Sequence, residues 1–191
     1  GNDNLTSEFV KTTELVWIFQ DKDFSSEIVF FHNDLRDFIN KVPFSGSAQF
    51  TFDNTVDIKI SGLENSVNFE LSEEVRLSLN YTHLFDDPIN ESFKHFGSAN
   101  LSYNWGRWKF NTNVIWRDEV KIPQINDMRF VQEHYLLVSG KVSYNLDDKQ
   151  KVSLVAQNLF NKGYVVFDPR VFNGEVPGKG REISISYSYL F

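Results

Sequence analysis

The 191-residue sequence predicts an all-β protein, an antiparallel up-and-down transmembrane β-barrel with a meander of about nine strands. Three observations support this fold class. Apolar and polar residues alternate with a period of two along successive segments. Short and long connections between these segments alternate. The last segment places an apolar residue at every second position and finishes on the aromatic residue Phe191.

The first three strands are expected at residues 13–20, 27–39 and 56–71, which are rich in branched and aromatic residues. Residues 40–54 contain Pro, Gly and several Ser and Asn, and predict a long loop with some strand extension at 48–52. Within residues 56–71 the apolar positions change from even to odd numbers. This change predicts a β-bulge at Gly62, where one strand gains a residue against its partner.

The remaining strands alternate cleanly, and are expected at residues 75–85, 97–105, 108–116, 135–146, 151–158 and 182–191. Short turns fall near 21–24, 72–74, 106–107 and 147–150, and long loops near 40–54, 86–96, 118–133 and 161–181. A meander places all short turns at one end and all long loops at the other, as in transmembrane barrels. The connections of a Greek-key sandwich do not separate in this way.

From Val75 onward the predicted apolar face carries no charged residue. The charges within the strands lie on the opposite face: Arg76, Lys109, Arg117, Lys141 and Lys151. A cationic side chain facing lipid at mid-bilayer costs roughly 2–4 kcal/mol, so this distribution is expected of a membrane-spanning sheet. A one-sided antiparallel sheet in water alternates in the same way, so a soluble β-sandwich stays an alternative.

Composition and motifs exclude several functions. The chain has no Cys, so disulfides and thiolate metal sites are impossible. Its net charge is −7 and it shows no basic stripe, so no nucleic acid is expected as a partner. No zinc-protease, nucleophile-elbow or phosphate-loop motif occurs, and we expect neither an enzyme nor a metal site. The sequence contains no run of about 18 apolar residues, so it predicts no transmembrane helix.

Three local patterns resemble the TonB-dependent outer-membrane receptors. GNDNLTSE at 1–8, followed by TEL at 13–15, resembles the family's "NPxLKPE…ExG" segment, with Asp3 and Ser7 where that pattern has Pro. SGLE at 61–64 resembles its "GxE" strand. VAQNLFNKGY at 155–164, with PGKGR at 177–181 and the terminal strand, resembles its "NLFdkxY…PGR…F" ending.

The resemblance implies that residues 1–191 form the C-terminal part of a barrel of about 22 strands with a plugged lumen. The plug domain, the N-terminal strands and the TonB box would lie outside this sequence. Such a receptor sits in the bacterial outer membrane and imports a scarce nutrient such as a siderophore, haem, cobalamin or an oligosaccharide. An odd strand count also predicts that the first and last strands stay unpaired, since bacterial single-chain barrels have even numbers.

The resemblance also implies partners. These are outer-membrane lipid, the rest of the receptor, a TonB-type periplasmic energiser, the nutrient and the barrel-assembly machinery. The terminal residues Tyr187, Tyr189 and Phe191 resemble the signal that this machinery reads. No cofactor is expected.

Candidate ligand-binding residues come from the long loops, where binding residues usually lie. They are His95, Arg129, His134, Phe167, Arg170 and Phe172. Three functional alternatives stay open: a passive porin-like channel, a soluble β-sandwich module that binds carbohydrate, and an outer-membrane hydrolase, for which no Ser/His/Asp constellation is visible.

Overall fold

The computed structural model describes residues 2–43, 50–86, 93–123, 129–167 and 175–191. All its regular elements are strands: β1 (Phe9–Gln20), β2 (Phe24–Pro43), β3 (Phe50–Glu70), β4 (Val75–Leu84), β5 (His95–Trp105), β6 (Trp108–Arg117), β7 (Val120–Pro123), β8 (Arg129–Gln132), β9 (Tyr135–Asn145), β10 (Gln150–Gln157), β11 (Val165–Phe167), β12 (Glu175–Pro177) and β13 (Glu182–Tyr189). Within the described ranges, no helix is long and apolar enough to cross a membrane.

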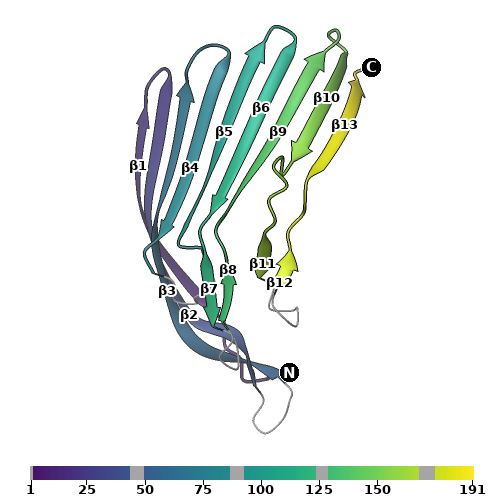
Figure 1. Cartoon of the computed structure of the whole chain (residues 1–191). Coiled ribbons are helices and arrows are strands. Elements are labelled where there is room, and N and C mark those ends of the chain that lie inside the picture. Colours follow the sequence, from purple (N-terminus) through teal and green to yellow (C-terminus); the bar gives the residue numbers. More distant parts are fainter. Residues whose placement is uncertain (1, 44–49, 87–92, 124–128, 168–174) are drawn as a thin grey trace.

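Nine of these strands form one antiparallel sheet in the order β1-β2-β3-β4-β5-β6-β9-β10-β13 (Figure 1). The other four strands form two small hairpins, β7–β8 and β11–β12, within long connections between sheet strands. The predicted meander is confirmed. Among the described residues no second large sheet packs against the nine-stranded one, which contradicts the β-sandwich alternative.

The two ends of the sheet differ as the sequence predicts. The turns at residues 21–23, 71–74, 106–107 and 146–149 lie at the upper end in Figure 1, as does the C-terminus. The longer connections, with the hairpins β7–β8 and β11–β12, lie at the lower end. Gly106 has a φ of 55°, a conformation that a tight two-residue hairpin needs and that glycine adopts at little cost.

Strand register carries a mainly apolar face across the sheet. Leu79 pairs with Ala99, Ala99 with Val114, and Val114 with Val138. Many large apolar residues of this face are exposed, among them Leu79, Leu101 and Leu154, and Ile185 reaches 75%. Fully burying one such side chain gains about 1.5–3 kcal/mol, so a continuous face left exposed requires lipid or another apolar partner.

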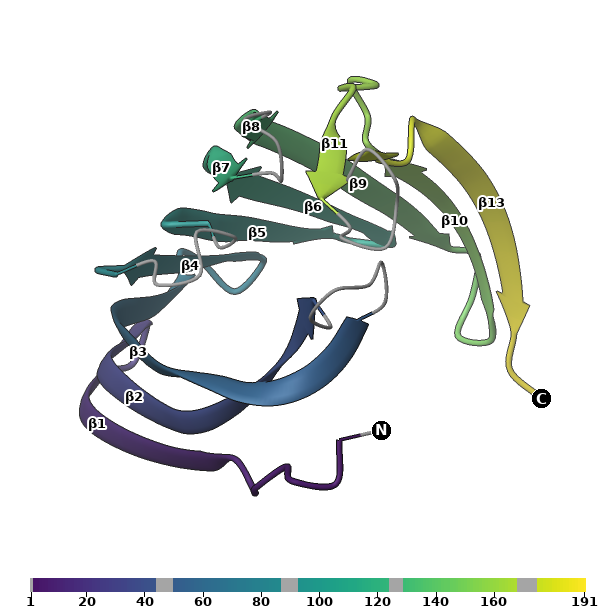
Figure 2. The same cartoon turned by 90° about the horizontal axis from the view of Figure 1, so that it is seen from below.

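The sheet curves into a trough, seen from below in Figure 2. Curvature crowds the side chains on the concave side, where the polar residues Ser143 and Ser153 are buried. Ser153 is 2% exposed, and its Oγ lies 2.9 Å from the Oγ of Ser143 on the neighbouring strand. The polar face is therefore concave and the apolar face convex, as expected for the wall of a barrel whose lumen is wet.

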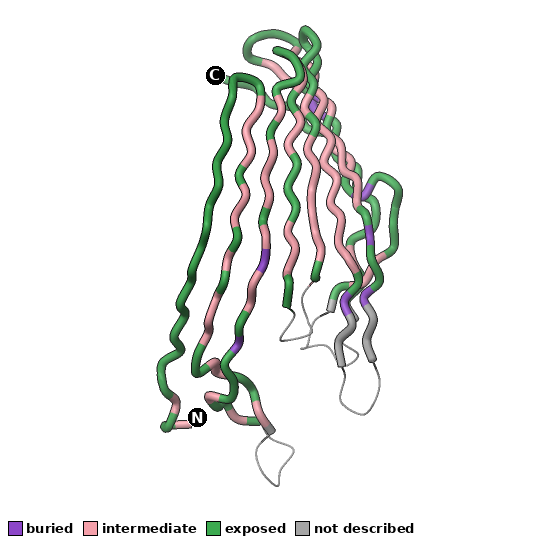
Figure 3. The backbone as a smooth tube through the Cα atoms, turned by 90° about the vertical axis from the view of Figure 1, so that its left-hand side faces the viewer, coloured by how far each residue is buried: buried purple, intermediate pink, exposed green. Residues whose placement is uncertain are grey.

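The sheet does not close. In the part of the chain that the structure describes, β1 and β13 are the two edges and do not pair with each other. β1 is exposed along its whole length, drawn in green in Figure 3. This confirms the predicted open meander with two free edges.

The β2–β3 hairpin corrects two predictions. β2 runs to Pro43 and β3 begins at Phe50, so residues 40–43 and 50–54 of the expected loop are strand, and the expected strand extension is confirmed over 50–52. Residues 44–49 lie outside the described part of the chain. The expected bulge at Gly62 is also wrong, because the ladder to β2 runs without a break from Phe69 to Ile58. The register shifts lie farther along, between Leu35 and Ile39 of β2.

The apolar positions of β3 change from even to odd numbers because its apolar residues lie on different faces at its two ends, and not because the register to β2 changes at Gly62. The pairing of β3 with β4 stops at Gly62, so β2 and β3 continue beyond the rest of the sheet. Ile58 and Ile60 pair with Leu35 and Asn33 and lie on the concave side, where Ile58 is buried. Where β2 and β3 extend past the other strands, their convex face no longer needs to be apolar.

Candidate functional site

Three long connections come together at the loop end of the concave face. Val120, which is 4% exposed, packs against Phe93 and Val165. Tyr135, which is 8% exposed, has its ring centre 6.4 Å from that of Phe93 and 4.7 Å from that of Tyr164. These five residues, here called the loop cluster, join connections that are far apart in sequence. They form a small apolar core where the trough meets its loops.

Arg117 lies beside the loop cluster at the end of β6. Its guanidinium carbon is 4.9 Å from the ring centre of Phe96 and 5.8 Å from that of Phe93. Its Nη1 donates a hydrogen bond of 3.2 Å to the carbonyl oxygen of Trp116. The register pairs Arg117 with Phe96 on one side and Tyr135 on the other, so all three side chains share the concave face.

A hollow of about 300 Å³ lies at this position. Ile115, Phe96 and Arg117 line part of it, and the polar residues Asn80, Thr82, Ser98 and Asn113 line another part, with Tyr81 and Gly97 completing the lining. Asn80 is held by its neighbours, since its Nδ2 donates to Ser98 Oγ at 3.3 Å and its Oδ1 accepts from Ser66 Oγ at 2.9 Å. The hollow therefore combines the cation of Arg117, the ring of Phe96 and fixed polar groups.

The ligand residues predicted from the sequence lie in different places. His95 is on the convex face, with its Nδ1 2.7 Å from Tyr81 Oη and its ring stacked 4.2 Å from that of His83. His134 is exposed between β8 and β9. Arg129 begins β8 and Phe167 ends β11, two hairpin strands that contact each other beside the loop cluster.

Arg170 and Phe172 lie outside the described residues. The sequence did not single out Arg117 as a ligand residue, although it placed the arginine on the polar face next to a long loop. That position was the available signal, but the flanking Phe93 and Phe96 become visible only when the strands are paired.

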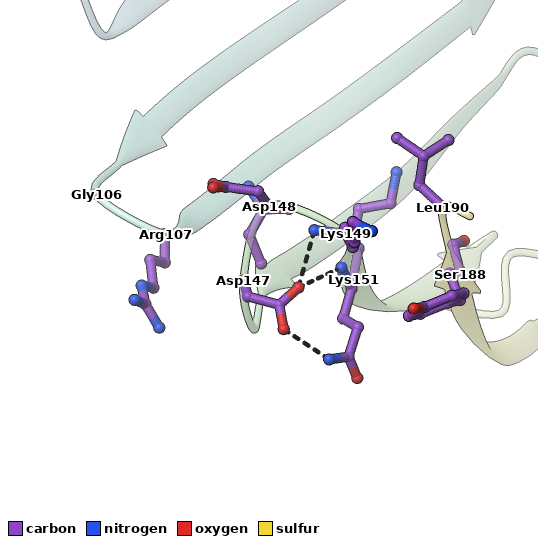
Figure 4. Close-up of a pocket in the computed structure, with 11 residues that line it drawn as sticks. Gly106, Arg107, Asp147, Asp148, Lys149, Lys151, Ser188 and Leu190 are labelled. Carbon is purple, nitrogen blue, oxygen red and sulfur yellow. Dashed lines mark hydrogen bonds between the residues drawn. The ribbon is translucent and has the colours of Figure 1, made fainter.

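A second hollow, of about 640 Å³, lies at the short-turn end between the 106–107 turn, the 146–149 turn and the end of β13 (Figure 4). Asp147 organises it, because its carboxylate accepts bonds from the backbone N–H groups of Lys149 and Gln150, both at 2.8 Å. Arg107 Nη1 donates to the Leu146 carbonyl oxygen at 2.8 Å. These bonds shape the turn itself.

The terminal aromatic residues lie on the convex face near that end. Tyr187 Oη donates to Gln150 Oε1 at 2.8 Å, and the rings of Tyr189 and Phe191 meet edge to face at 5.1 Å. All three are exposed. Their position matches the aromatic belt expected at a membrane–water boundary. Across the described ranges, no cluster of three or more His, Asp or Glu residues is arranged to hold a metal ion.

A curved antiparallel meander with an apolar convex face, a polar concave face and all its long loops at one end defines a wall of the outer-membrane β-barrel class. Comparison with known families agrees. The family described as TonB dependent receptor-like, beta-barrel matches residues 1–159. The chain belongs to this family.

Individual relatives support the fold. The crystal structure of the siderophore receptor PirA from Acinetobacter baumannii superposes with a TM-score of 0.82 at 18% identity, over 100% of this chain and 33% of that one. The iron-regulated outer membrane virulence protein of Vibrio cholerae is 24% identical over 186 residues, or 85% of this chain and 28% of that protein. The chain thus spans about a third of the length of these relatives.

A different match is to uricase from Drosophila subobscura, 28% identical over 119 residues, which cover 62% of this chain and 34% of that protein. This match is weak and partial, whereas the receptor family covers residues 1–159 and the family consists of transport receptors.

Proposed function

We propose that residues 1–191 form the C-terminal part of the barrel of an outer-membrane active-transport receptor. The observation that carries the proposal is the family match over residues 1–159, joined to an open sheet whose exposed convex face is apolar. The relatives named for siderophores and iron regulation favour an iron chelate as the nutrient. Haem, cobalamin and oligosaccharides are the other nutrients in the proposal.

In this proposal each face of the sheet has its own partner. Outer-membrane lipid covers the convex face, and further strands of the same receptor extend β1 and β13 into a closed barrel. A plug domain fills the concave side, where Ser and Asn side chains offer hydrogen bonds, and a TonB-type periplasmic protein supplies energy through it. The barrel-assembly machinery reads Tyr187, Tyr189 and Phe191.

The ligand enters from the loop end. The loop cluster, Arg117 and the segments carrying Arg129, His134, Phe167, Arg170 and Phe172 form its receiving surface. His95 faces the convex side with Tyr81 and Trp116, and we place it at the outer rim of the membrane. The proposal includes no catalytic step.

Uptake by intact cells tests this function. Cells with and without the gene for the full receptor are grown under iron limitation and given a radiolabelled ferric chelate. We expect uptake to require both the receptor and an energised inner membrane, and the receptor to fractionate with the outer membrane. Uptake that persists after the proton-motive force is dissipated would instead indicate a passive porin-like channel.

A further inference from the structure

Resting on the proposed function, we infer that Arg117 selects the charge of the ligand by binding an anionic oxygen-bearing group at the hollow beside it. The group is a carboxylate or a catecholate, whose paired oxygens match the fork of a guanidinium. The inference concerns one residue of the concave face and the chemistry that it recognises.

The charge of Arg117 is available. Arg36 pairs with Asp34 at 3.0 Å and Arg76 pairs with Glu70 at 3.3 Å. In the described part of the chain, Arg117 forms no such ion pair with a carboxylate. Its aromatic neighbours stabilise the cation through their ring faces without neutralising it.

The side chain is also oriented in advance. Phe96 and Phe93 contact the guanidinium, and the bond from Nη1 to the Trp116 carbonyl oxygen uses one of its five N–H donors. Among the described residues this guanidinium donates no other hydrogen bond, which leaves donors for a ligand. Because the side chain is already half-buried and held, less conformational entropy is lost when the ligand binds.

The hollow limits what can bind there. Its volume of about 300 Å³ is at the lower end of ordinary ligand pockets, so it suits one limb of a larger chelate. Ser98 and Asn113 line it and can donate hydrogen bonds to further oxygens of the same limb. The strands β5 and β6 provide these groups and Arg117 together, so their spacing is set by the ladder.

The test uses the full-length receptor, purified in detergent, with Arg117→Gln and Arg117→Lys variants. The probes are a triply anionic ferric tris-catecholate and a neutral ferric tris-hydroxamate, and binding is followed by quenching of tryptophan fluorescence. We expect Arg117→Gln to weaken binding of the anionic complex by about 10- to 100-fold, as for loss of a charge-assisted hydrogen bond. Arg117→Lys should fall between, and binding of the neutral complex should stay within about twofold.

Lys109→Gln is the matched control, because Lys109 lies on the same face of β6 at the opposite end. Heat-modifiable gel migration checks that each variant is folded. If Arg117→Gln does not fold, the comparison of the two complexes is made with Arg117→Lys, which keeps the charge. Equal weakening of both complexes, or a receptor that binds only the neutral complex, overturns the inference while leaving the transport function standing. If the receptor binds neither complex, the inference fails and energised uptake of other nutrients decides the proposed function.

Discussion

At Gly62 the backbone of β3 passes so close to its neighbours that a methyl group has no room. An added Cβ would lie 2.7 Å from the carbonyl oxygen of His83 and 2.6 Å from the ring of Phe31. The ring can move, but the oxygen belongs to the β3–β4 ladder. Close approach of two backbones is therefore the reason for glycine at this position.

We predict that Gly62→Ala lowers the free energy of unfolding by about 1–3 kcal/mol, the usual cost of overpacking. The measurement is urea unfolding of the full receptor in lipid vesicles. Gly163→Ala is the control, since an added Cβ there meets nothing within 4 Å. Equal stability of the two variants would show that the strands relax around the methyl group.

Asp147 makes the 146–149 turn sensitive to acid. The bond from the Lys149 backbone N–H, followed by the bonds from Gln150, holds the pKa of the Asp147 carboxyl below its usual value of 3.8. Because the pKa is lower in the folded state, the stabilisation is complete above the unfolded pKa and is lost as the pH falls through the folded pKa.

Asp147→Asn should therefore be less stable than the parent at neutral pH, and the difference should shrink as the pH falls through the acid range below the unfolded value. Unfolding midpoints measured across that range provide the check. Asp148→Asn in the same turn controls for the loss of one charge. A difference that is independent of pH would mean that the carboxylate does not hold the turn.

At the scale of the strand, the two faces require opposite chemistry. Arg at Leu79 or Val114 would face lipid, and Arg at the neighbouring Asn80 or Asn113 would face the concave side. We predict that each substitution of the first kind costs about 2–4 kcal/mol in a membrane-folding assay, and that the second kind costs much less. If both kinds are tolerated equally, the assignment of the convex face to lipid is wrong.

The terminal strand is expected to serve assembly as well as stability. Phe191 meets the ring of Tyr189 edge to face on the convex face and is fully exposed. We predict that deleting Phe191 reduces the amount of assembled receptor in the outer membrane while total synthesis stays unchanged, as quantified by fractionation and immunoblotting. Phe160→Ala, which removes an exposed aromatic residue outside the strands, is the control. Normal assembly of the deletion would remove the terminal strand from the recognition step.

At the scale of the whole molecule, the open edges decide what the 191 residues do alone. Each unpaired backbone group facing lipid costs several kcal/mol, and β1 offers a 12-residue edge. We predict that residues 1–191 expressed alone give no heat-modifiable band in vesicles, and that co-expression with the rest of the receptor restores one. A heat-modifiable, protease-resistant product from the 191 residues alone would indicate an autonomous small barrel.

Much of the fold was predictable because its determinants are local. Alternation with a period of two identified the strands and assigned Leu79 and Asn80 to opposite faces. Turn residues such as Gly106 identified the short connections, and the odd number of strands anticipated the open edges. Each of these properties depends on residues that are neighbours in the chain.

The errors and omissions arose where the decisive partner is distant in sequence. The apolar residues Ile58 and Ile60 suggested a bulge at Gly62, but how far β3 outruns β4 depends on where their pairing ends. The role proposed for Arg117 as a ligand-binding residue depends on its position beside Phe93 and the rest of the loop cluster, and only the pairing of the strands brings these residues together. Period and turn chemistry thus determined the strands and their faces, whereas tertiary pairing alone decided which loop residues meet, because those contacts join segments that no local pattern relates.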